Sequence, residues 1–320
     1  MTSTPVCERL GIEVPIIQAP IGSATTPELA AAVANAGGLG TLALSWTDLA
    51  RTRERIRRTR ALTERPFAVN LVLDWDQHDR LRICIDERVP IISTFWGDAA
   101  PYVERIHEAG AVHIHTVGTV AEARLAAGAG VDVLVAQGIE AGGHVRGDTS
   151  TTALVPAIVD AVTPAPVIAA GGIADARGVS AALALGAQGA WIGSRFLVAL
   201  EANTHPEYRR RLIEATEDDT VCCSVFDRGW PNAPHRVLRN STIIAWEASG
   251  RPPAPNRPGE GDVVGATPTG TPLLRYGFGI PVAGTTGDVE AMAMYAGAGV
   301  GHIHACEPAA DIVRALLPGA

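Results

Sequence analysis

One short segment of the chain combines residue types that could do chemistry. Residues 137–144 read QGIEAGGH, so an amide, a carboxylate and two adjacent glycines precede a histidine. The imidazole side chain has an ordinary pKa of about 6.5, which suits proton transfer near neutrality. His144 could therefore take a proton from a substrate, or hold a substrate oxygen as an N–H donor. A loop histidine can also serve only to satisfy a nearby carbonyl group.

Two glycine-containing turns indicate a phosphate site. Gly171 and Gly172 stand in AAGGI, and Gly193 and Ser194 stand in IGSR, each directly after an apolar run. Backbone N–H groups in such turns can bind phosphate oxygens, and a Cβ atom there would keep the phosphate away. Either pair alone could be an ordinary tight turn. The two pairs together favour a bound phosphate.

The remaining polar residues near apolar runs suit a flavin that carries this phosphate. Asn70 and Gln137 are neutral amides that both donate and accept, as the pyrimidine edge of an isoalloxazine ring requires. The segment QAPI, residues 18–21, offers small residues and backbone against such a ring. The chain has no G-x-G-x-x-G segment with a downstream acid, which disfavours a Rossmann dinucleotide site.

Other histidines and the cysteines are weaker candidates. His113 and His115 are two residues apart on one predicted strand and face the same side, and His115 lies nearer the strand end. We expect Glu140 to have a structural role and His235 to lie on the surface or between domains. The five cysteines have no metal-ligand spacing, so we predict thiols and no metal site.

The elements that must position these residues alternate regularly over the first 200 residues. Short apolar runs, typical of strands buried on both faces, alternate with Ala-rich helical segments such as TTPELAAAVANAGG. Eight successive units predict a (β/α)8 barrel, an α/β fold that carries its chemistry at the carboxyl ends of the strands. A doubly wound open sheet is the competing fold. The predicted strands are Pro15–Gln18, Leu39–Leu42, Phe67–Leu71, Ile91–Phe95, Val112–Thr116, Val133–Gln137, Val167–Ala170 and Ala190–Gly193.

The pattern breaks after Ser194. Residues 201–285 contain several arginines and the run SGRPPAPNRPGEGDVVGATPTGTP, which is too long for one barrel loop. We therefore expect a smaller inserted domain at 201–285 that covers the barrel mouth. Residues 1–200 and 286–320 would form the barrel.

Composition excludes several classes of function. The net charge is −8 and all 26 basic residues are arginine, so Schiff-base chemistry and a Walker-type lysine are absent. We do not expect a protein with this negative net charge to bind nucleic acid. No uninterrupted apolar stretch is long enough to span a membrane, and the N-terminus lacks the apolar core of a signal peptide. We expect a cytoplasmic protein with no membrane partner, and a homo-oligomer is compatible with these features.

Three segments of the chain resemble the nitronate monooxygenase family, once called 2-nitropropane dioxygenases. They are PIIQAPIGSATTPELAAAVANAGGLG, QGIEAGGHVRG and AAGGIADARGVSAALALGAQGAWIGSRF. In the second segment the last glycine is displaced by one residue, because Val145 and Arg146 precede Gly147. The resemblance implies an FMN-binding (β/α)8 barrel with a second, smaller domain. It also implies oxidation of alkyl nitronates, such as propionate 3-nitronate, by O2 to a carbonyl compound and nitrite.

The resemblance also assigns site residues. His144 matches a histidine beside the flavin, as a base or a nitronate-positioning group, and Tyr295 matches an aromatic position near the substrate, to which we add His115. The residues assigned to FMN are Gln18, Ala19, Pro20, Ile21, Asn70, Gln137, Gly142, Gly143, Gly171, Gly172, Trp191, Ile192, Gly193 and Ser194. The same barrel occurs in flavin enoyl-ACP reductases and NAD(P)H:quinone reductases. The long segment 201–285 weighs against the former, whereas the latter stays open.

Overall fold

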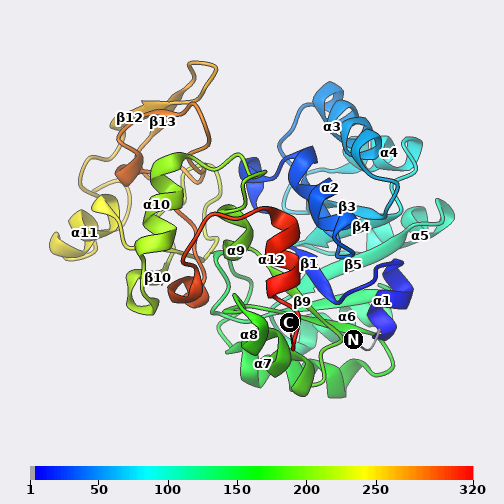
Figure 1. The fold of residues 1–320 in the computed structure, drawn as a ribbon. Coiled ribbons are helices and arrows are strands. Elements are labelled where there is room, and N and C mark those ends of the chain that lie inside the picture. Colours follow the sequence, from blue (N-terminus) through cyan, green and yellow to red (C-terminus); the bar gives the residue numbers. More distant parts are fainter. Residues whose placement is uncertain (1–3, 320) are drawn as a thin grey trace.

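The computed structural model describes residues 4–319 and has a closed barrel of parallel strands at its centre (Figure 1). Eight strands lie in the order β1-β9-β8-β6-β5-β4-β3-β2, and a parallel bridge between Ile17 and Leu39 closes the ring. The predicted (β/α)8 barrel is therefore confirmed. Its strands are β1 (Ile16–Gln18), β2 (Gly40–Ala43), β3 (Phe67–Val72), β4 (Ile91–Phe95), β5 (Val112–Val117), β6 (Val133–Gln137), β8 (Val167–Ala170) and β9 (Gly189–Ile192).

Helices between the strands form the outer shell. Local sequence explains where they begin: in α2, the Thr26 side chain accepts from the Leu29 N–H group and Pro27 occupies the first turn. Near the C-terminus, α12 packs Ile312 and Val313 against Leu29 and completes the shell. The shell helices are α1 (Pro5–Leu10), α2 (Pro27–Asn35), α3 (Leu49–Leu62), α4 (His78–Asp86), α5 (Ala100–Glu108), α6 (Val120–Gly128), α7 (Thr151–Val162), α8 (Ala176–Ala184), α9 (Ser194–Leu197) and α12 (Ala309–Ala315). None of the helices in residues 4–319 is long and apolar enough to cross a membrane.

The strands are buried on both faces because alternate residues point into the barrel and out toward the helices. Ala68, Ile91 and Ile114 belong to one buried cluster in the interior of the barrel. Their sequence neighbours Val69 and Ile92 pack into a different cluster, beneath the helices. This alternation decides which side chains at the strand ends can face a ligand.

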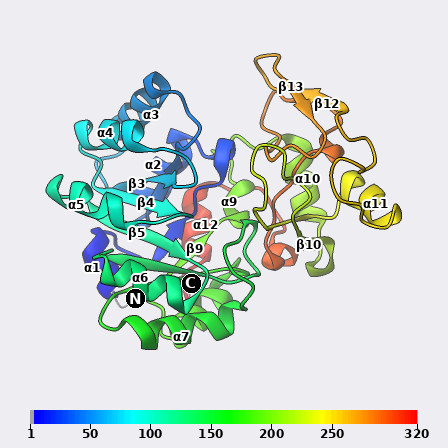
Figure 2. The same ribbon diagram turned by 180° about the vertical axis from the view of Figure 1, so that it is seen from behind.

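Residues between α9 and α12 form a second region that lies beside the barrel, as the yellow and orange segments show in both views (Figures 1 and 2). It contains two small antiparallel sheets, and one of them includes a barrel loop, because β7 (Gly143–His144) pairs with β11. The division at residue 285 stays a prediction; β14 continues a small sheet just past it. The elements of this region are α10 (Pro206–Glu214), β10 (Thr220–Cys223), β11 (His235–Leu238), α11 (Ser241–Ala248), β12 (Val263–Ala266), β13 (Pro272–Leu274) and β14 (Thr286–Gly287), with short 3-10 turns at Glu217–Asp219, Val289–Ala291 and Ala298–His302. A further 3-10 turn, Gly22–Ala24, follows β1 in the barrel.

Candidate active site

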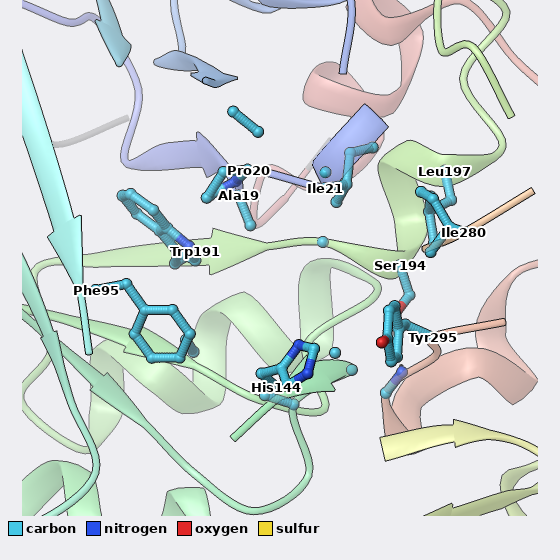
Figure 3. A pocket seen from close by; sticks show the side chains of 18 of the residues that line it. Ala19, Pro20, Ile21, Phe95, His144, Trp191, Ser194, Leu197, Ile280 and Tyr295 are labelled. Atoms are coloured by element: carbon cyan, nitrogen blue, oxygen red, sulfur yellow. The ribbon is translucent and has the colours of Figure 1, made fainter. Parts of the chain in front are cut away.

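A large cavity opens at the carboxyl ends of the barrel strands (Figure 3). Its free space is about 1420 Å³ when the solvent at its open mouth is counted. The segments that follow β1, β2, β6, β8 and β9 line it, and the second region covers one side. Twelve predicted flavin residues line this cavity: Ala19, Pro20, Ile21, Asn70, Gln137, Gly142, Gly143, Gly171, Gly172, Trp191, Gly193 and Ser194, and the predicted His144 and Tyr295 line it as well.

The glycine turns after β8 and β9 fit a phosphate. No backbone oxygen in residues 4–319 accepts from the N–H groups of Gly172 or Gly193. A Cβ atom on Gly193 would meet only Ala19 and Ile21, both at 3.7 Å, so packing alone does not require glycine there. An open turn with free amides is the arrangement that an anion needs.

The donors for such an anion would come from the turns rather than from the start of α8. The Asp175 carboxylate already accepts from the first amides of that helix, those of Arg177 and Gly178. A third glycine segment joins the two predicted turns, since the Gly297 N–H group donates to Ser194 Oγ at 2.9 Å. This segment is far away in the sequence, and the glycine-rich YAGAGVG run was its only signal.

Some predicted glycines have a packing role of their own. A side chain at Gly142 would overlap the backbone of Gly297, and one at Gly171 would overlap the Thr151 side chain. Gly143 has φ +83° with free space around it, so its backbone conformation requires glycine. Glycine is thus needed at these positions for the fold, whether or not a ligand contacts them.

The two predicted amides differ in what they leave free. Asn70 Oδ1 accepts from Ser93 Oγ at 3.0 Å, which leaves its NH2 group for a ligand. Gln137 instead holds the loop that carries His144: its Nε2 donates to the His144 carbonyl oxygen and its Oε1 accepts from the Arg146 N–H group, both at 3.0 Å. Gln137 is therefore a positioning residue for the histidine loop.

His144 lies on β7 with its ring against the second region. The imidazole stacks on the Trp230 indole, with 4.0 Å between ring centroids and an interplanar angle of 29°. Its Nε2 atom is buried and has no hydrogen-bond partner among residues 4–319. Burial, and to a smaller extent the neighbouring His235, lowers the pKa of His144 to about 3. The ring is therefore neutral across the physiological pH range.

His235 faces His144 directly in the β7–β11 pair, where the second region meets the barrel loop, and it is fully buried. Of the two expected positions, the surface is therefore wrong, whereas the place between the two parts of the chain agrees with the structure. The His235 Nε2 accepts from the Phe226 N–H group at 3.1 Å, so Nδ1 carries the proton and donates to the Ala233 carbonyl at 2.9 Å. Burial lowers the pKa of His235 as well. This neighbour offers His144 no negative charge.

Three predicted site residues do not line the cavity. Gln18 is fully buried and its Oε1 accepts from the Thr41 N–H group. Ile192 packs into the core beneath α2 and α12. His115 points out of the barrel, opposite to Ile114 and Thr116, and its Nδ1 lies 2.8 Å from Thr94 Oγ1. His113 shares this orientation, as expected, and contacts the same hydroxyl.

Tyr295 lines the cavity, but its hydroxyl donates to the Phe278 carbonyl at 2.9 Å and so orders that segment. Glu140 is structural, as expected, because its carboxylate accepts from both the N–H and the hydroxyl of Thr151. The Tyr295 hydroxyl proton is thus already used within the protein, while the Tyr295 ring remains part of the cavity wall.

Sequence reasoning missed the aromatic residues at the cavity mouth. Trp46 follows β2, whereas Trp230 and Phe278 belong to the second region, and all three line the cavity. The Trp230 Nε1 group donates to Asp74 Oδ2 at 2.8 Å and so ties this region to the loop after β3. No local pattern relates residues that lie more than 150 positions apart.

Comparison with known proteins agrees with this arrangement. A family profile described as nitronate monooxygenase matches residues 3–81 and 75–319. A probable nitronate monooxygenase of Bacillus subtilis is 35% identical over 264 residues, which span 68% of this chain and 76% of that protein. A (3aS,4S,5R,7aS)-5-hydroxy-7a-methyl-1-oxo-octahydro-1H-indene-4-carboxyl-CoA dehydrogenase of Mycobacterium tuberculosis is 39% identical over 251 residues, or 78% of this chain and 69% of that one.

Two solved structures superpose on nearly the whole chain. FabK from Thermotoga maritima has a TM-score of 0.82 at 30% identity and covers 99% of this chain and 95% of its own, so segment 201–285 does not separate the two proteins. Nitroalkane oxidase from Streptomyces ansochromogenes has a TM-score of 0.79 at 28% identity and covers 97% and 96%. With its barrel, its glycine turns and these matches, the chain belongs to the nitronate monooxygenase family of flavin-dependent oxidoreductases.

Proposed function

We propose that this protein binds FMN and oxidises alkyl nitronates with O2 to a carbonyl compound and nitrite. The observation that carries the proposal is His144, a neutral imidazole held by Gln137 and Trp230 at the wall of a cavity that has an anion-binding end. Flavin, when bound, supplies electron acceptance from the substrate and electron transfer to O2. The protein supplies binding, orientation and shielding from water.

The free amides of Gly172 and Gly193, with Ser194, would hold the FMN phosphate. The free NH2 group of Asn70 would donate to the pyrimidine edge of the ring. No charged side chain among the described residues lines the cavity, so backbone dipoles would carry the phosphate charge.

The state of His144 favours one of its two candidate roles. A general base works best when its pKa lies near the working pH, and a pKa of about 3 makes this imidazole a weak base. A neutral imidazole can still donate one N–H to a nitronate oxygen. His144 therefore positions nitronates, which need no deprotonation, and we expect neutral nitroalkanes to react much more slowly.

Dehydrogenation of a larger carbon substrate is the second candidate. The relatives named as CoA dehydrogenases are 39% and 36% identical, somewhat more than the nitronate monooxygenases at 35%. The apolar rings of Trp46 and Phe278 in the cavity lining would suit a larger carbon group than a short alkyl nitronate carries.

Anaerobic mixing separates these activities. The purified protein should be yellow and release FMN, identified by mass, on denaturation. Ethyl nitronate should bleach the flavin at once, and added O2 should restore the colour with release of nitrite. Bleaching by NADH but not by nitronate would instead indicate a quinone or enoyl reductase. Bleaching only by an acyl-CoA thioester would favour the dehydrogenase.

A further inference from the structure

Three aromatic side chains surround the entrance to the cavity, and we call Trp46, Trp230 and Phe278 the aromatic mouth. They come from the loop after β2, the segment before β11 and the segment after β13. The ring centroids are 5.8 Å apart for Trp46–Trp230, 5.5 Å for Trp46–Phe278 and 6.4 Å for Trp230–Phe278. The three rings thus form one continuous aromatic cluster, of which Trp46 and Phe278 are partly exposed whereas Trp230 is buried.

Neighbouring side chains pack against the aromatic mouth on one side, and its other side is exposed to solvent. Trp75 packs behind it, 5.3 Å from Trp46 and 4.8 Å from Trp230, and Asp74 fixes the Trp230 indole. Trp46 nevertheless keeps 44% of its surface exposed. A large apolar ring exposed beside a cavity gains free energy when an apolar ligand covers it.

Charge is missing from the same surface. The residues that line the cavity in the described chain include no aspartate, glutamate or arginine, and the chain has no lysine. The arginine closest to His144 in sequence, Arg146, pairs with Glu122 at 2.8 Å and lies over the Trp96 ring. A carboxylate on the substrate would therefore lose water without gaining a cation.

We propose that the part of the substrate beyond the reacting carbon is an uncharged aromatic or alicyclic ring, and that Trp46 and Phe278 set this preference. The inference rests on the proposed nitronate activity only for its first assay. The proposed preference predicts tighter binding of ring nitronates than of propionate 3-nitronate, whose carboxylate would lie against the aromatic mouth. Trp230 contributes as well, but it also stacks on His144, so its substitution would not report on specificity alone.

The first assay compares four nitronates in anaerobic flavin reduction: those of nitroethane, phenylnitromethane, nitrocyclohexane and 3-nitropropionate. We expect the two ring nitronates to have half-saturation concentrations at least about 10-fold below that of ethyl nitronate, since even one extra methylene in an apolar pocket is worth roughly this factor. The half-saturation concentration of propionate 3-nitronate should be at least about 10-fold above that of ethyl nitronate, because the carboxylate, its second charge, has no partner.

Trp46→Ala and Phe278→Ala should remove the ring advantage, so that the half-saturation concentrations of the two ring nitronates rise to about that of ethyl nitronate in the same variant. Trp246→Phe is the matched control, because this tryptophan lies in α11, outside the cavity lining, and should change nothing. The proposal would be overturned if both variants raised the half-saturation concentrations of all four nitronates equally. Tight binding of propionate 3-nitronate by the wild type would also overturn it.

A binding assay keeps the inference independent of turnover. Cyclohexanone and succinate are titrated into the FMN-loaded protein, and the shift of the flavin absorbance is followed. Cyclohexanone should bind, Trp46→Ala should weaken this binding at least about 10-fold, and succinate should not bind. If no nitronate reduces the flavin but this pattern holds, the nitronate function fails and the ring preference stands. Binding of succinate in preference to cyclohexanone would refute the ring preference even if nitronates are turned over.

Discussion

At the scale of single residues, the environment of His144 decides its chemistry. The imidazole is enclosed by Trp230 and by a neutral His235, and no carboxylate contacts it to stabilise a positive charge. Burial thus acts without compensation and keeps the ring uncharged. A group in this state can donate one hydrogen bond and accept another, which suits the binding of an oxyanion better than proton abstraction.

The pH dependence follows from the lowered pKa of His144. Because the folded pKa of about 3 lies below the ordinary value, the ring is already neutral at every pH above about 4. Flavin reduction by a preformed nitronate should therefore show no inflection near pH 6.5. Stopped-flow rates between pH 5 and 8 test this, and an inflection near 6.5 that disappears in His144→Asn would show that His144 titrates near its ordinary pKa and is not held neutral.

Substitution of His144 separates the donor role from a packing role. Asn keeps an N–H donor of similar size, whereas Ala removes it. Loss of a hydrogen bond to a charged group costs about 1.5–3 kcal/mol, so His144→Ala should raise the nitronate half-saturation concentration about 10- to 100-fold. His144→Asn should retain most of the affinity, and both variants should keep FMN. Equal, unchanged affinities in the two variants would mean that the imidazole only fills space.

At the scale of elements, local sequence sufficed for the barrel and failed for its partner segments. Every predicted barrel strand lies within one residue of the observed strand at each end, because a strand buried on both faces is an uninterrupted apolar run between turn signals. The turns after β8 and β9 were predictable for the same reason. The pairing of His144 with His235 was not, since two-residue β7 has no periodicity to detect.

The difference between local patterns and tertiary contacts also explains which residues the sequence wrongly assigned to the cavity. Gln18 and His115 have polar side chains near strand ends, and only the side-to-side alternation of the finished barrel shows that they serve the core. Trp46 and Phe278 looked like ordinary apolar residues, because their shared surface exists only after the second region folds against the barrel.

The loop of His144 yields an element-scale prediction about Gln137. Gln137→Ala removes both hydrogen bonds to this loop, roughly 1–3 kcal/mol in sum, and should speed hydrogen exchange at residues 143–147. Nitronate reduction should slow with little loss of FMN. Asn70→Ala is the converse case: FMN affinity should fall by about 3- to 10-fold while exchange in the loop stays unchanged. The hypothesis fails if Gln137→Ala leaves the exchange of the loop unaltered.

The turn after β9 tests the phosphate assignment. Gly193 has an ordinary negative φ and open space at its Cβ position, so Gly193→Val should fold normally while filling the space before its amide. FMN should be lost almost completely, with thermal unfolding of the apoprotein unchanged. Gly128→Val, in α6 with nothing within 4 Å of its Cβ position, is the control that should keep FMN. Full occupancy in Gly193→Val would place the phosphate elsewhere.

At the scale of the whole molecule, barrel and second region share one site and one set of buried neutral histidines. The β7–β11 pairing and the Trp230–Asp74 hydrogen bond join the two parts across the cavity. Burial lowers the pKa of His113 to about 3 and that of His115 to about 4, beneath the helical shell, while His144 and His235 lie at the junction. Protonation of any of them requires opening of the structure around it.

The stability of the protein should therefore fall steeply in mild acid. Each of His113, His115 and His144 has a folded pKa below its unfolded value of about 6.5, so the unfolded chain binds more protons below that pH. Each of these histidines lowers the free energy of unfolding by about 1.4 kcal/mol per pH unit as the pH falls from about 6 to about 4, or by roughly 4 kcal/mol per pH unit for the three together. Stability is retained above pH 6.5 and is lost as the pH falls. Urea unfolding at pH 7.5, 6 and 5 measures this slope, and His113→Gln should reduce it by about one third. A flat profile from pH 7.5 to 5 would show that these histidines are not held neutral by burial.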